Sequence, residues 1–357
     1  MHARSLSALL GFALLTAYAA PAQTPAATSS TQDISIPKDP KELLSLAREV
    51  NGLSSSDMKP WHIKYSYQTF DSDGKQVNQG TFEEWWVAPD KYKREWVSTH
   101  LNQTEYHTRD GYFRVGDEGS PSVAELTVLN KVVTQIPPEA KLADYTIQHR
   151  DNPYPHANLT CVETAGHLDH IIPGAPEGIF PFYCFDQDKP ILRSAGSYGS
   201  HTALYQRIGS LGGHYIPIDL QIMDAGKNYA TAHLEEGNLI PTVNETAFQP
   251  PADAVPESKI KMIAASAAVL KGSRVGGAQP IYPVGSKQDR IQGKVILPAL
   301  IEEDGSVQQL EVLTAPDYRL AIAAIIAVHS WKYQPYLLNG KPVSVETQIN
   351  VIYTLGG

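Results

Sequence analysis

The sequence has only two cysteines, no run of basic residues and few long apolar stretches. Its 357 residues include 29 Lys and Arg against 38 Asp and Glu, which gives a net charge of −9. An acidic chain without a basic run argues against a nucleic-acid partner. Past the first residues, no stretch stays apolar over the roughly twenty residues that a membrane-spanning helix needs. We therefore expect a soluble chain, and its length favours two domains.

Recognisable catalytic motifs are also missing. Glu83 and Glu84 are neighbours on an expected strand, so their carboxylates point to opposite faces and cannot act as a pair. Segment 196–200 lacks the Gly-x-Ser-x-Gly order of a serine elbow. Segment 209–213 has no following helix and no Lys-Ser/Thr to hold a phosphate. We expect no catalytic residue, no cofactor and no enzymatic activity.

A metal site is not expected either. His167, Asp169 and His170 carry groups that bind metals, but they lack a third partner at helical or hairpin spacing. A solvated loop is therefore the favoured interpretation. His329 falls on the face of an expected helix, where a packed or half-exposed histidine is the ordinary case.

The first segment, Met1–Ala22, has the features of a secretory signal. Arg4 supplies one positive charge, Leu6–Tyr18 is mostly apolar, and small-x-small sites follow. We expect cleavage after Ala22 and export to the periplasm of a Gram-negative-type cell. An uncleaved inner-membrane anchor is the less favoured alternative, because the apolar run is short. Residues 23–38, which begin Ala/Ser/Thr/Pro-rich, are expected to be disordered.

Residues 39–246 predict a β-rich domain. Lys41–Val50 and Val123–Val133 are the expected helices. The other elements are short strands separated by turn residues, which indicates a large curved antiparallel sheet or half-barrel. The expected strands are 61–70, 76–87, 92–97, 103–108, 112–115, 144–149, 159–163, 182–186, 191–194, 202–208, 215–223 and 228–234.

This succession of long, aromatic-rich strands after one helix resembles the periplasmic lipoprotein carriers of the LolA/LolB type. The resemblance implies a half-open barrel that holds acyl chains, and hence an apolar ligand. The aromatic residues would either line such a cavity or form an ordinary core. They are Tyr65, Tyr67, Trp85, Trp86 and Trp96.

The two cysteines lie in strand-like segments of an exported chain. A disulfide between Cys161 and Cys184, joining neighbouring strands, is the expected arrangement. Two buried thiols are the alternative. A catalytic thiol is disfavoured because neither residue belongs to a Cys-x-x-Cys pair or has a recognisable base beside it.

Residues 247–257 form a short proline-rich linker, and residues 258–357 predict a small α+β module. Its expected elements are strands at 291–301 and 307–313, a helix at 318–331 and a last strand ending near Tyr353. In that strand Val345, Thr347, Ile349, Val351 and Tyr353 face one way. Pro298 falls inside the first strand and must face an edge or a bulge.

Five short motifs occur in order within this module. They are QPxYP at 279–283, Gln292-Gly293-x-Val295, Asp304-Gly305-x-Val307, W-x-Y-x-P at 331–335, and Asn339-Gly340-Lys341-Pro342-Val343. Together they resemble the C-terminal domain of the TonB energy-transducer family, over about residues 258–355. In that family a short extended peptide of an outer-membrane receptor, the TonB box, adds to the last strand by β-augmentation.

The resemblance assigns partner-binding roles to residues of this chain. Gln279 would contact the partner, and Pro280, Tyr282 and Pro283 would hold their segment extended. Strand 345–353 would accept the partner's strand. We therefore expect a non-enzymatic envelope protein that recognises a protein partner. The alternatives are a carrier for an apolar ligand and an anchored energy transducer, and a homodimer through exposed strands is a further option.

Overall fold

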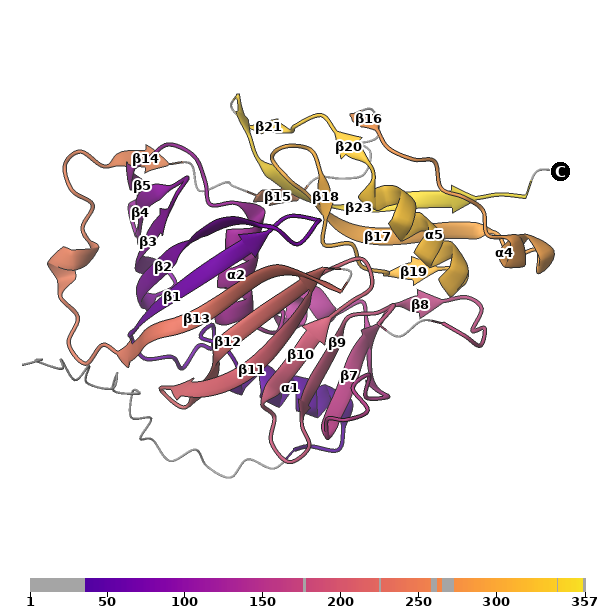
Figure 1. Ribbon diagram of the computed structural model, residues 1–357, viewed down its shortest axis with the longest axis horizontal. Helices are drawn as coiled ribbons and strands as arrows, with labels where there is room; N and C mark the ends of the chain where they lie inside the picture. Colours follow the sequence, from indigo (N-terminus) through magenta and orange to yellow (C-terminus); the bar gives the residue numbers. More distant parts are fainter. Residues whose placement is uncertain are drawn as a thin grey trace, which may run out of the picture.

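The computed structural model describes residues 36–175, 178–224, 226–257, 262–264, 273–338 and 340–355. Its strands form one large and one small sheet with a few helices, so the predicted α+β class is confirmed (Figure 1). The predicted signal segment Met1–Ala22 lies outside the described residues. Within them, no helix has both the length and the apolar character needed to cross a membrane.

The large sheet, sheet A, has 13 strands in the order β14-β5-β4-β3-β2-β1-β13-β12-β11-β10-β9-β7-β6. All of its pairs are antiparallel, and most join strands that follow one another in the chain, which a meander with short turns requires. Its strands are β1 (Trp61–Phe70), β2 (Gln76–Ala88), β3 (Lys91–Ser98), β4 (Asn102–Thr108), β5 (Gly111–Gly116), β6 (Thr146–Arg150), β7 (Leu159–Ala165), β9 (Phe182–Asp186), β10 (Leu192–Gly196), β11 (Thr202–Leu211), β12 (His214–Asp224), β13 (Lys227–Leu239) and β14 (Val255–Glu257).

Two helices pack into the core of sheet A. Helix α1 (Pro40–Val50) begins at Asp39, whose carboxylate accepts hydrogen bonds from two backbone N–H groups of the first turn. Helix α2 (Val123–Val133) begins with a capping box between Ser122 and Glu125. The buried faces of both helices join one apolar cluster with residues of the sheet. Both predicted helices are therefore confirmed.

The aromatic residues considered as cavity lining belong mostly to this core. Tyr65, Tyr67 and Trp96 are buried, and Trp86 stacks on buried Trp61 with ring centroids 5.9 Å apart. Trp85 instead packs against His62 on the opposite face of the sheet. The ordinary-core interpretation holds for four of the five side chains.

The disulfide is confirmed. Cys161 of β7 and Cys184 of β9 are directly opposite each other in the antiparallel ladder, with Cα atoms 4.1 Å apart, and their sulfurs are bonded. Both are buried in a small apolar cluster with Phe182. The bond cross-links two strands at the end of sheet A that faces the C-terminal module.

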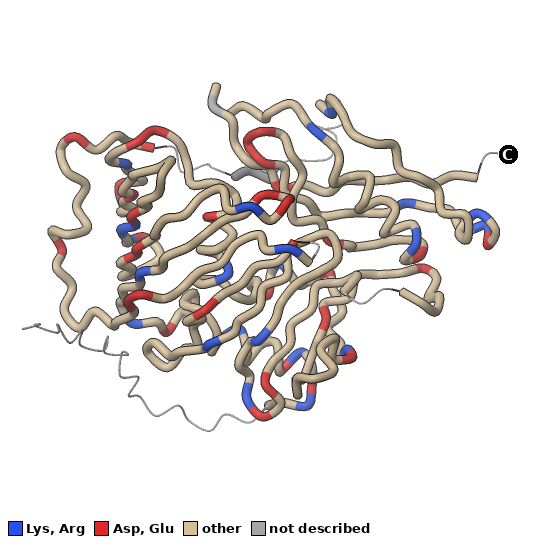
Figure 2. The backbone as a smooth tube through the Cα atoms, in the orientation of Figure 1, with Lys and Arg blue, Asp and Glu red and all other residues tan. Residues whose placement is uncertain are grey.

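A ladder of charges crosses the other end of sheet A (Figure 2). Arg94 on β3 pairs with Glu84 of β2 at 2.8 Å and with Glu105 of β4 at 3.4 Å. Arg114 on β5 pairs with Glu257 of β14 at 2.7 Å. Opposite charges on neighbouring strands stabilise the register. The predicted linker 247–257 is therefore held on the sheet at its end.

The small sheet, sheet B, has the order β15-β23-β17-β19-β8, with β18 also paired to β17. Helix α5 (Tyr318–His329) covers one of its faces, and its buried residues join the apolar cluster of the sheet. The predicted strand 307–313 is present only as β18, with β19 starting just after it. The elements are β8 (His167–Leu168), β15 (Met262–Ala264), β17 (Gly293–Ile301), β18 (Val307–Gln308), β19 (Thr314–Ala315), β23 (Ser344–Tyr353) and α4 (Val284–Gln288); two further pairs join β16 (Arg274–Gly276) to β20 (Lys332–Tyr333) and β21 (Leu337–Leu338) to β22 (Lys341–Pro342).

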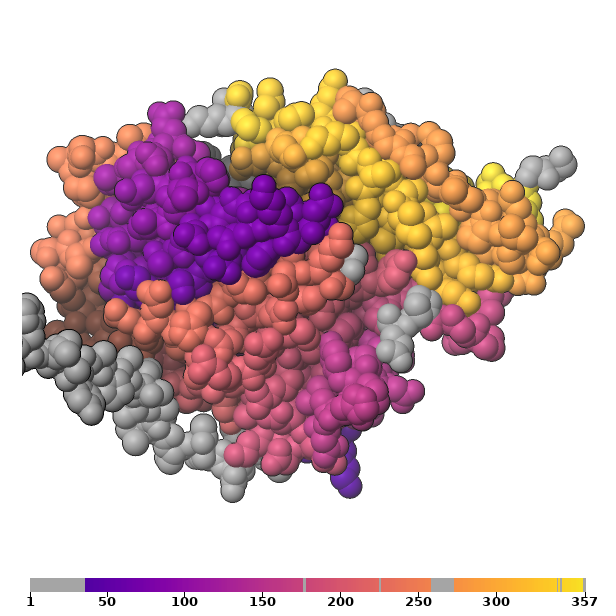
Figure 3. Space-filling model, in the orientation of Figure 1, coloured from indigo at the N-terminus to yellow at the C-terminus, as the bar shows by residue number. Residues whose placement is uncertain are grey.

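Sheet B is completed by a strand from the N-terminal half. β8 pairs in parallel with β19, and Gly166 just before it lies so close to β19 that a Cβ atom there would be 2.3 Å from the Val312 carbonyl oxygen. Residues 165, 179 and 180 are buried in the same apolar cluster as α5 and β17. His329 at the end of α5 bonds the Gly199 carbonyl at 2.8 Å. Figure 3 shows the two halves in contact along this seam.

Candidate functional site

The edge of β23 is built by its register with β17. The two strands pair continuously from Gly293↔Tyr353 to Ile301↔Val345. On the other side of β17, the carbonyl oxygens of Ile296 and Pro298 accept hydrogen bonds from Leu313 and Glu311. Backbone groups alternate in direction along a strand, so the groups of Val295, Leu297 and Ala299 point to β23.

This register decides which backbone groups of β23 are available. Thr347, Ile349 and Val351 are the partners of the β17 residues whose groups point inward, so their own N–H and C=O groups bond to β17. The groups of the alternate residues point to the other edge. Among the described residues, no strand pairs with that edge beyond Glu346. Within the described part of the chain, the outward N–H and C=O groups of Gln348, Asn350 and Ile352 therefore meet no other strand.

Pro298 fits this arrangement as predicted. It lies opposite Gln348 in the ladder, and its ring nitrogen, which cannot donate, points away from β23. On that side β17 pairs with β18 at Leu300 and with β19 at Ile296, and the ladder is interrupted between them. The proline therefore costs sheet B no ladder bond.

The first part of the edge is occupied by the chain itself. β15 pairs in parallel with β23, with Ile263 opposite Val345. In a parallel ladder, a residue bonds to the two neighbours of its opposite residue, here Ser344 and Glu346. The backbone groups of the even-numbered residues therefore point away from β17 along the whole of β23. The edge of β23 accepts a strand from elsewhere in the chain.

The predicted strand residues of the site have buried side chains. Val345, Ile349, Val351 and Tyr353 lie in the core with α5, and Thr347 is buried beside them. They position the strand, but their side chains do not face a partner. The alternate residues are accessible, and Ile352 is 69% exposed. The alternation in the sequence separates the buried residues from the accessible ones. Only the register with β17 shows which of these residues have backbone groups that point to the outer edge.

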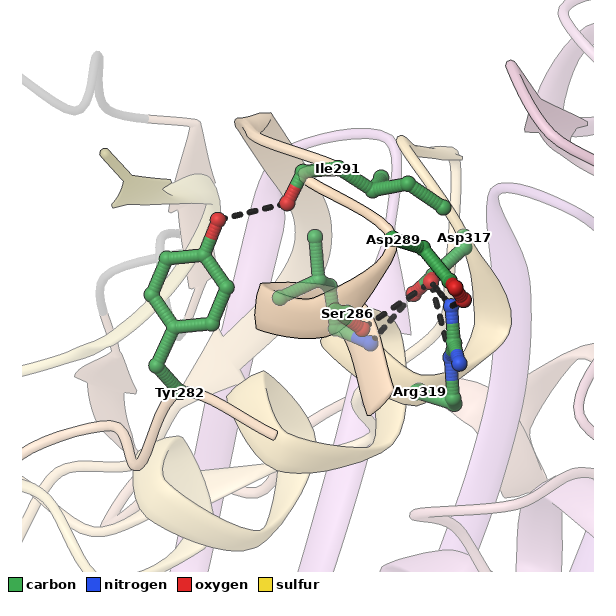
Figure 4. A network of polar contacts seen from close by, with 7 residues as sticks. Tyr282, Ser286, Asp289, Ile291, Asp317 and Arg319 are labelled. Atoms are coloured by element: carbon green, nitrogen blue, oxygen red, sulfur yellow. Dashed lines mark hydrogen bonds and ion pairs between the residues drawn. The ribbon is translucent and has the colours of Figure 1, made fainter. Parts of the chain in front are cut away.

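The predicted segment Gln279–Pro283 runs beside the end of β23. The Tyr282 ring packs edge-on against Tyr353, and its hydroxyl donates a 2.5 Å hydrogen bond to the Ile291 carbonyl (Figure 4). Gln279 is exposed, while Pro280, Tyr282 and Pro283 are half-buried. Tyr282 is thus brought to the β23 end of the candidate site.

A polar network anchors the same segment to helix α5. Asp317, fully buried, accepts from the Leu320 N–H at 2.8 Å and from the Ser286 hydroxyl at 3.0 Å (Figure 4). Arg319 pairs with Asp317 at 2.7 Å and with Asp289 at 2.8 Å. A carboxylate with this many donors is stabilised although it is buried. The network fixes α4 and the segment before it.

The sequence of this module has a known counterpart. Residues 278–355 match the family model of the Gram-negative bacterial TonB protein C-terminal. The predicted resemblance is confirmed for these residues. The TonB C-terminal-like module thus runs from the segment containing Tyr282 through β17 and α5 to the end of β23. No curated protein matches the chain.

The solved structures similar to this chain have low identity and TM-scores below 0.5. A LolA superfamily protein from Nitrosomonas europaea is 12% identical, with 59% of this chain and 97% of that chain covered and a TM-score of 0.38. A domain from Vibrio parahaemolyticus described as that of an outer-membrane lipoprotein-sorting protein is 7% identical, covering 58% and 94%, with a TM-score of 0.37. MucB is 12% identical, covering 61% and 65%, with a TM-score of 0.29.

The other sequence candidates form no site in the described residues. His167 belongs to β8 and pairs with Asp169 at 3.2 Å on the surface. No group of three metal-binding side chains occurs in the part of the chain that the structure describes.

Proposed function

We propose that this is an exported, non-enzymatic protein of a Gram-negative-type envelope that recognises a partner protein by strand addition. The partner's extended segment would pair with β23 along Gln348, Asn350 and Ile352. The observation that carries the proposal is that no described strand covers β23 at these residues, because N–H and C=O groups that point outward in a row are a template for another strand. The match of residues 278–355 to the TonB C-terminal family supports it.

The partner would meet a composite surface. The TonB C-terminal-like module shares β8 and part of its apolar core with the N-terminal half, so it is held against sheet A. Lys141, between α2 and β6, pairs with Glu346 of β23 at 2.7 Å across the seam. Recognition would therefore take place at a fixed position beside sheet A. This differs from a module carried on an extended rod.

A proline in the edge of β23 tests the proposal. Asn350→Pro removes an N–H that points to the edge and leaves the ladder bonds to β17 in place. Asn350→Ala is the matched control, since it changes the side chain and keeps the N–H. A photo-crosslinking residue at position 352, which is exposed, would report the captured partner in intact cells.

We expect Asn350→Pro to lower capture by about tenfold, because the edge loses one backbone hydrogen bond and the proline ring stands where the partner's strand must approach. Asn350→Ala should keep capture near that of the unaltered protein. Equal capture by both variants, each shown by circular dichroism to be folded, would contradict strand addition.

Two other functions were expected as alternatives. A carrier with its apolar ligand inside sheet A is not favoured by the packing, because α1, α2 and the aromatic side chains fill that core. An anchored energy transducer depends on Met1–Ala22, which lies outside the described residues. The N-terminal mass of the protein from its native envelope separates these cases, since an intact Met1 in the membrane fraction favours the transducer.

A further inference from the structure

Two hollows lie on the seam between sheet A and the TonB C-terminal-like module, with volumes of about 170 and 610 Å³. The larger one falls within the range of roughly 300–1,000 Å³ that is usual for small-molecule sites. The hollows border on each other, because they share the lining residues Pro137, Pro181, Tyr183, Gln309 and Glu311.

The smaller hollow is polar and contains an unpaired cation. Lys131 lines it from α2, and hydroxyl and imidazole groups of Ser197, Ser200 and His201 line it from the loop after β10. Among the described residues, neither an ion pair nor a hydrogen bond is formed by the Lys131 ammonium. Burial lowers the pKa of Lys131, and only the more distant charge of Glu311 opposes this effect. A partly buried ammonium without a partner is a binding group for an anion.

Glu311 provides the opposite charge where the two hollows meet. The Tyr145 hydroxyl donates to its carboxylate at 3.3 Å, and no ion pair of 4 Å or less joins it to Lys131 in the described residues. Burial raises the pKa of Glu311. Both side chains are therefore partly buried without the direct contact that usually compensates such a pair.

The backbone beside Glu311 is unusual. Gln309 has a φ of 51°, and apart from Arg290 it is the one non-glycine residue with positive φ in the described chain. A non-glycine residue in this region is strained, and such strain concentrates at functional sites. The strain occurs at a residue that lines both hollows.

The larger hollow offers an apolar lining. Leu142, Pro298, Leu300 and Leu313 contribute to it, from both sides of the seam. The one lysine among its described lining residues, Lys141, is already paired with Glu346. The seam thus combines a free cation, a separate carboxylate and an adjoining apolar space.

We propose that the seam binds a small zwitterionic molecule with an apolar body. Its anionic group would contact Lys131, its cationic hydrogen-bond donor would contact Glu311, and its apolar body would occupy the larger hollow. A short apolar peptide with free ends and a lipid with a zwitterionic headgroup share this chemistry. The larger hollow is also lined by Gln348 and Asn350, so the site adjoins the β23 edge. Its charged contacts, Lys131 and Glu311, lie outside β23, and binding there does not require strand addition.

Calorimetric titration of the full chain tests this with two probes. The first is leucyl-leucine and the second is a lysophosphatidylethanolamine with a short acyl chain, used below its micellar concentration. N-acetyl-leucyl-leucine methyl ester, which lacks both charges, is the control ligand for the first. Binding of one probe and not the other identifies the source of the zwitterion.

Lys131→Met and Glu311→Gln each remove one charge at nearly constant volume. We expect each to weaken binding by about tenfold or more, the effect of losing one charged hydrogen bond. Lys59→Met, at an exposed position outside both hollows, is the matched control and should leave binding unchanged. Lys131→Arg should retain binding.

The proposal is overturned if neither probe binds at millimolar concentration. It is also overturned if either probe binds the folded Lys131→Met variant as tightly as the unaltered protein. The thermal unfolding midpoint of each variant shows that it is folded, so a lost interaction is not confused with a lost structure. Failure here leaves strand addition at β23 untouched.

Discussion

The Tyr282 and Tyr353 rings pack edge-to-face with centroids 5.3 Å apart, but their hydroxyls differ. The Tyr282 hydroxyl donates to the Ile291 carbonyl, whereas the buried Tyr353 hydroxyl has no partner among the described residues. The first hydroxyl ties the Gln279–Pro283 segment to Ile291, just before β17, and the second has no bond among the described residues. The two rings therefore respond differently to the same substitution.

Removing one hydroxyl at a time measures this difference. We expect Tyr282→Phe to lower the free energy of unfolding by about 1 kcal/mol, because the Ile291 carbonyl loses its donor. Tyr353→Phe should be neutral or slightly stabilising, since an unsatisfied buried hydroxyl disappears. Urea unfolding of both variants checks this, and a larger loss for Tyr353→Phe would contradict the hydrogen-bond assignment.

The seam depends on a close backbone approach at Gly166. A Cβ at this position would lie 2.3 Å from the Val312 oxygen and 2.5 Å from the Leu313 oxygen. We expect Gly166→Ala to lower the free energy of unfolding by about 2 kcal/mol or more, because β8 must move away from β19. Gly237→Ala, whose Cβ would find its nearest atom at 3.6 Å, is the control and should change stability by less than about 1 kcal/mol. Hydrogen exchange should show faster exchange at His167 and Ala315 only in the first variant.

Because the His201 imidazole is buried, we expect the protein to lose stability in mild acid. Burial lowers the pKa of this imidazole from 6.5 to about 4. Between these values the unfolded chain binds a proton that the folded chain does not, so stability falls as the pH falls from about 6.5 to about 4. The full effect is about 3 kcal/mol.

A variant isolates this contribution from the other titrating groups. His201→Phe keeps an aromatic ring against Tyr229, which stacks on His201 at 3.8 Å, and cannot titrate. We expect the unaltered protein to lose more stability than the variant between neutral pH and about pH 4.5. Parallel urea titrations measure it, and identical pH dependence of the two proteins would show that His201 is not the group responsible.

The disulfide cross-links β7 and β9 over a separation of 23 residues. Replacing Cys161 and Cys184 together by Ala should lower the free energy of unfolding by about 3 kcal/mol, mainly because the unfolded chain is less constrained. Thermal unfolding under oxidising conditions measures the loss. The same measurement with a reductant present should bring the unaltered protein close to the double variant; a persistent difference would show that packing of the thiols matters more than the cross-link.

Lys131→Met separates a structural from a binding role. If the ammonium supported the fold, its removal would destabilise the protein. Because it is partly buried without a direct partner, we expect the midpoint of thermal unfolding to rise by roughly 2 °C or more. A fall in the midpoint would show that Lys131 forms a stabilising contact in solution.

Local signals in the sequence were sufficient for most elements. Helix α2 has its predicted bounds, Val123–Val133, because the Ser122 capping box and the apolar period are both local. Strand β1 likewise runs from Trp61 to Phe70, as its alternation indicates. The ordered motifs of the C-terminal module were equally informative, since the match at 278–355 confirms them.

What the sequence could not supply depends on contacts between distant segments. β8 has two residues and no periodicity, and it exists only because β19 lies beside it. The outward direction of the Gln348 and Asn350 backbone groups follows from the bonds on the far side of β17, which no pattern in β23 encodes. Lys131 and Glu311 are far apart in the chain, and only the seam brings them to one site.

The strand shared between the two sheets has a consequence for fragments of the chain. A protease that cut between Glu257 and Met262 would sever the connection between β14 and β15. The C-terminal piece would still hold β8 by its backbone, Gly199 through His329, and an apolar cluster that residues from both pieces complete. The nicked protein would therefore migrate as one particle on a sizing column and come apart only in denaturant.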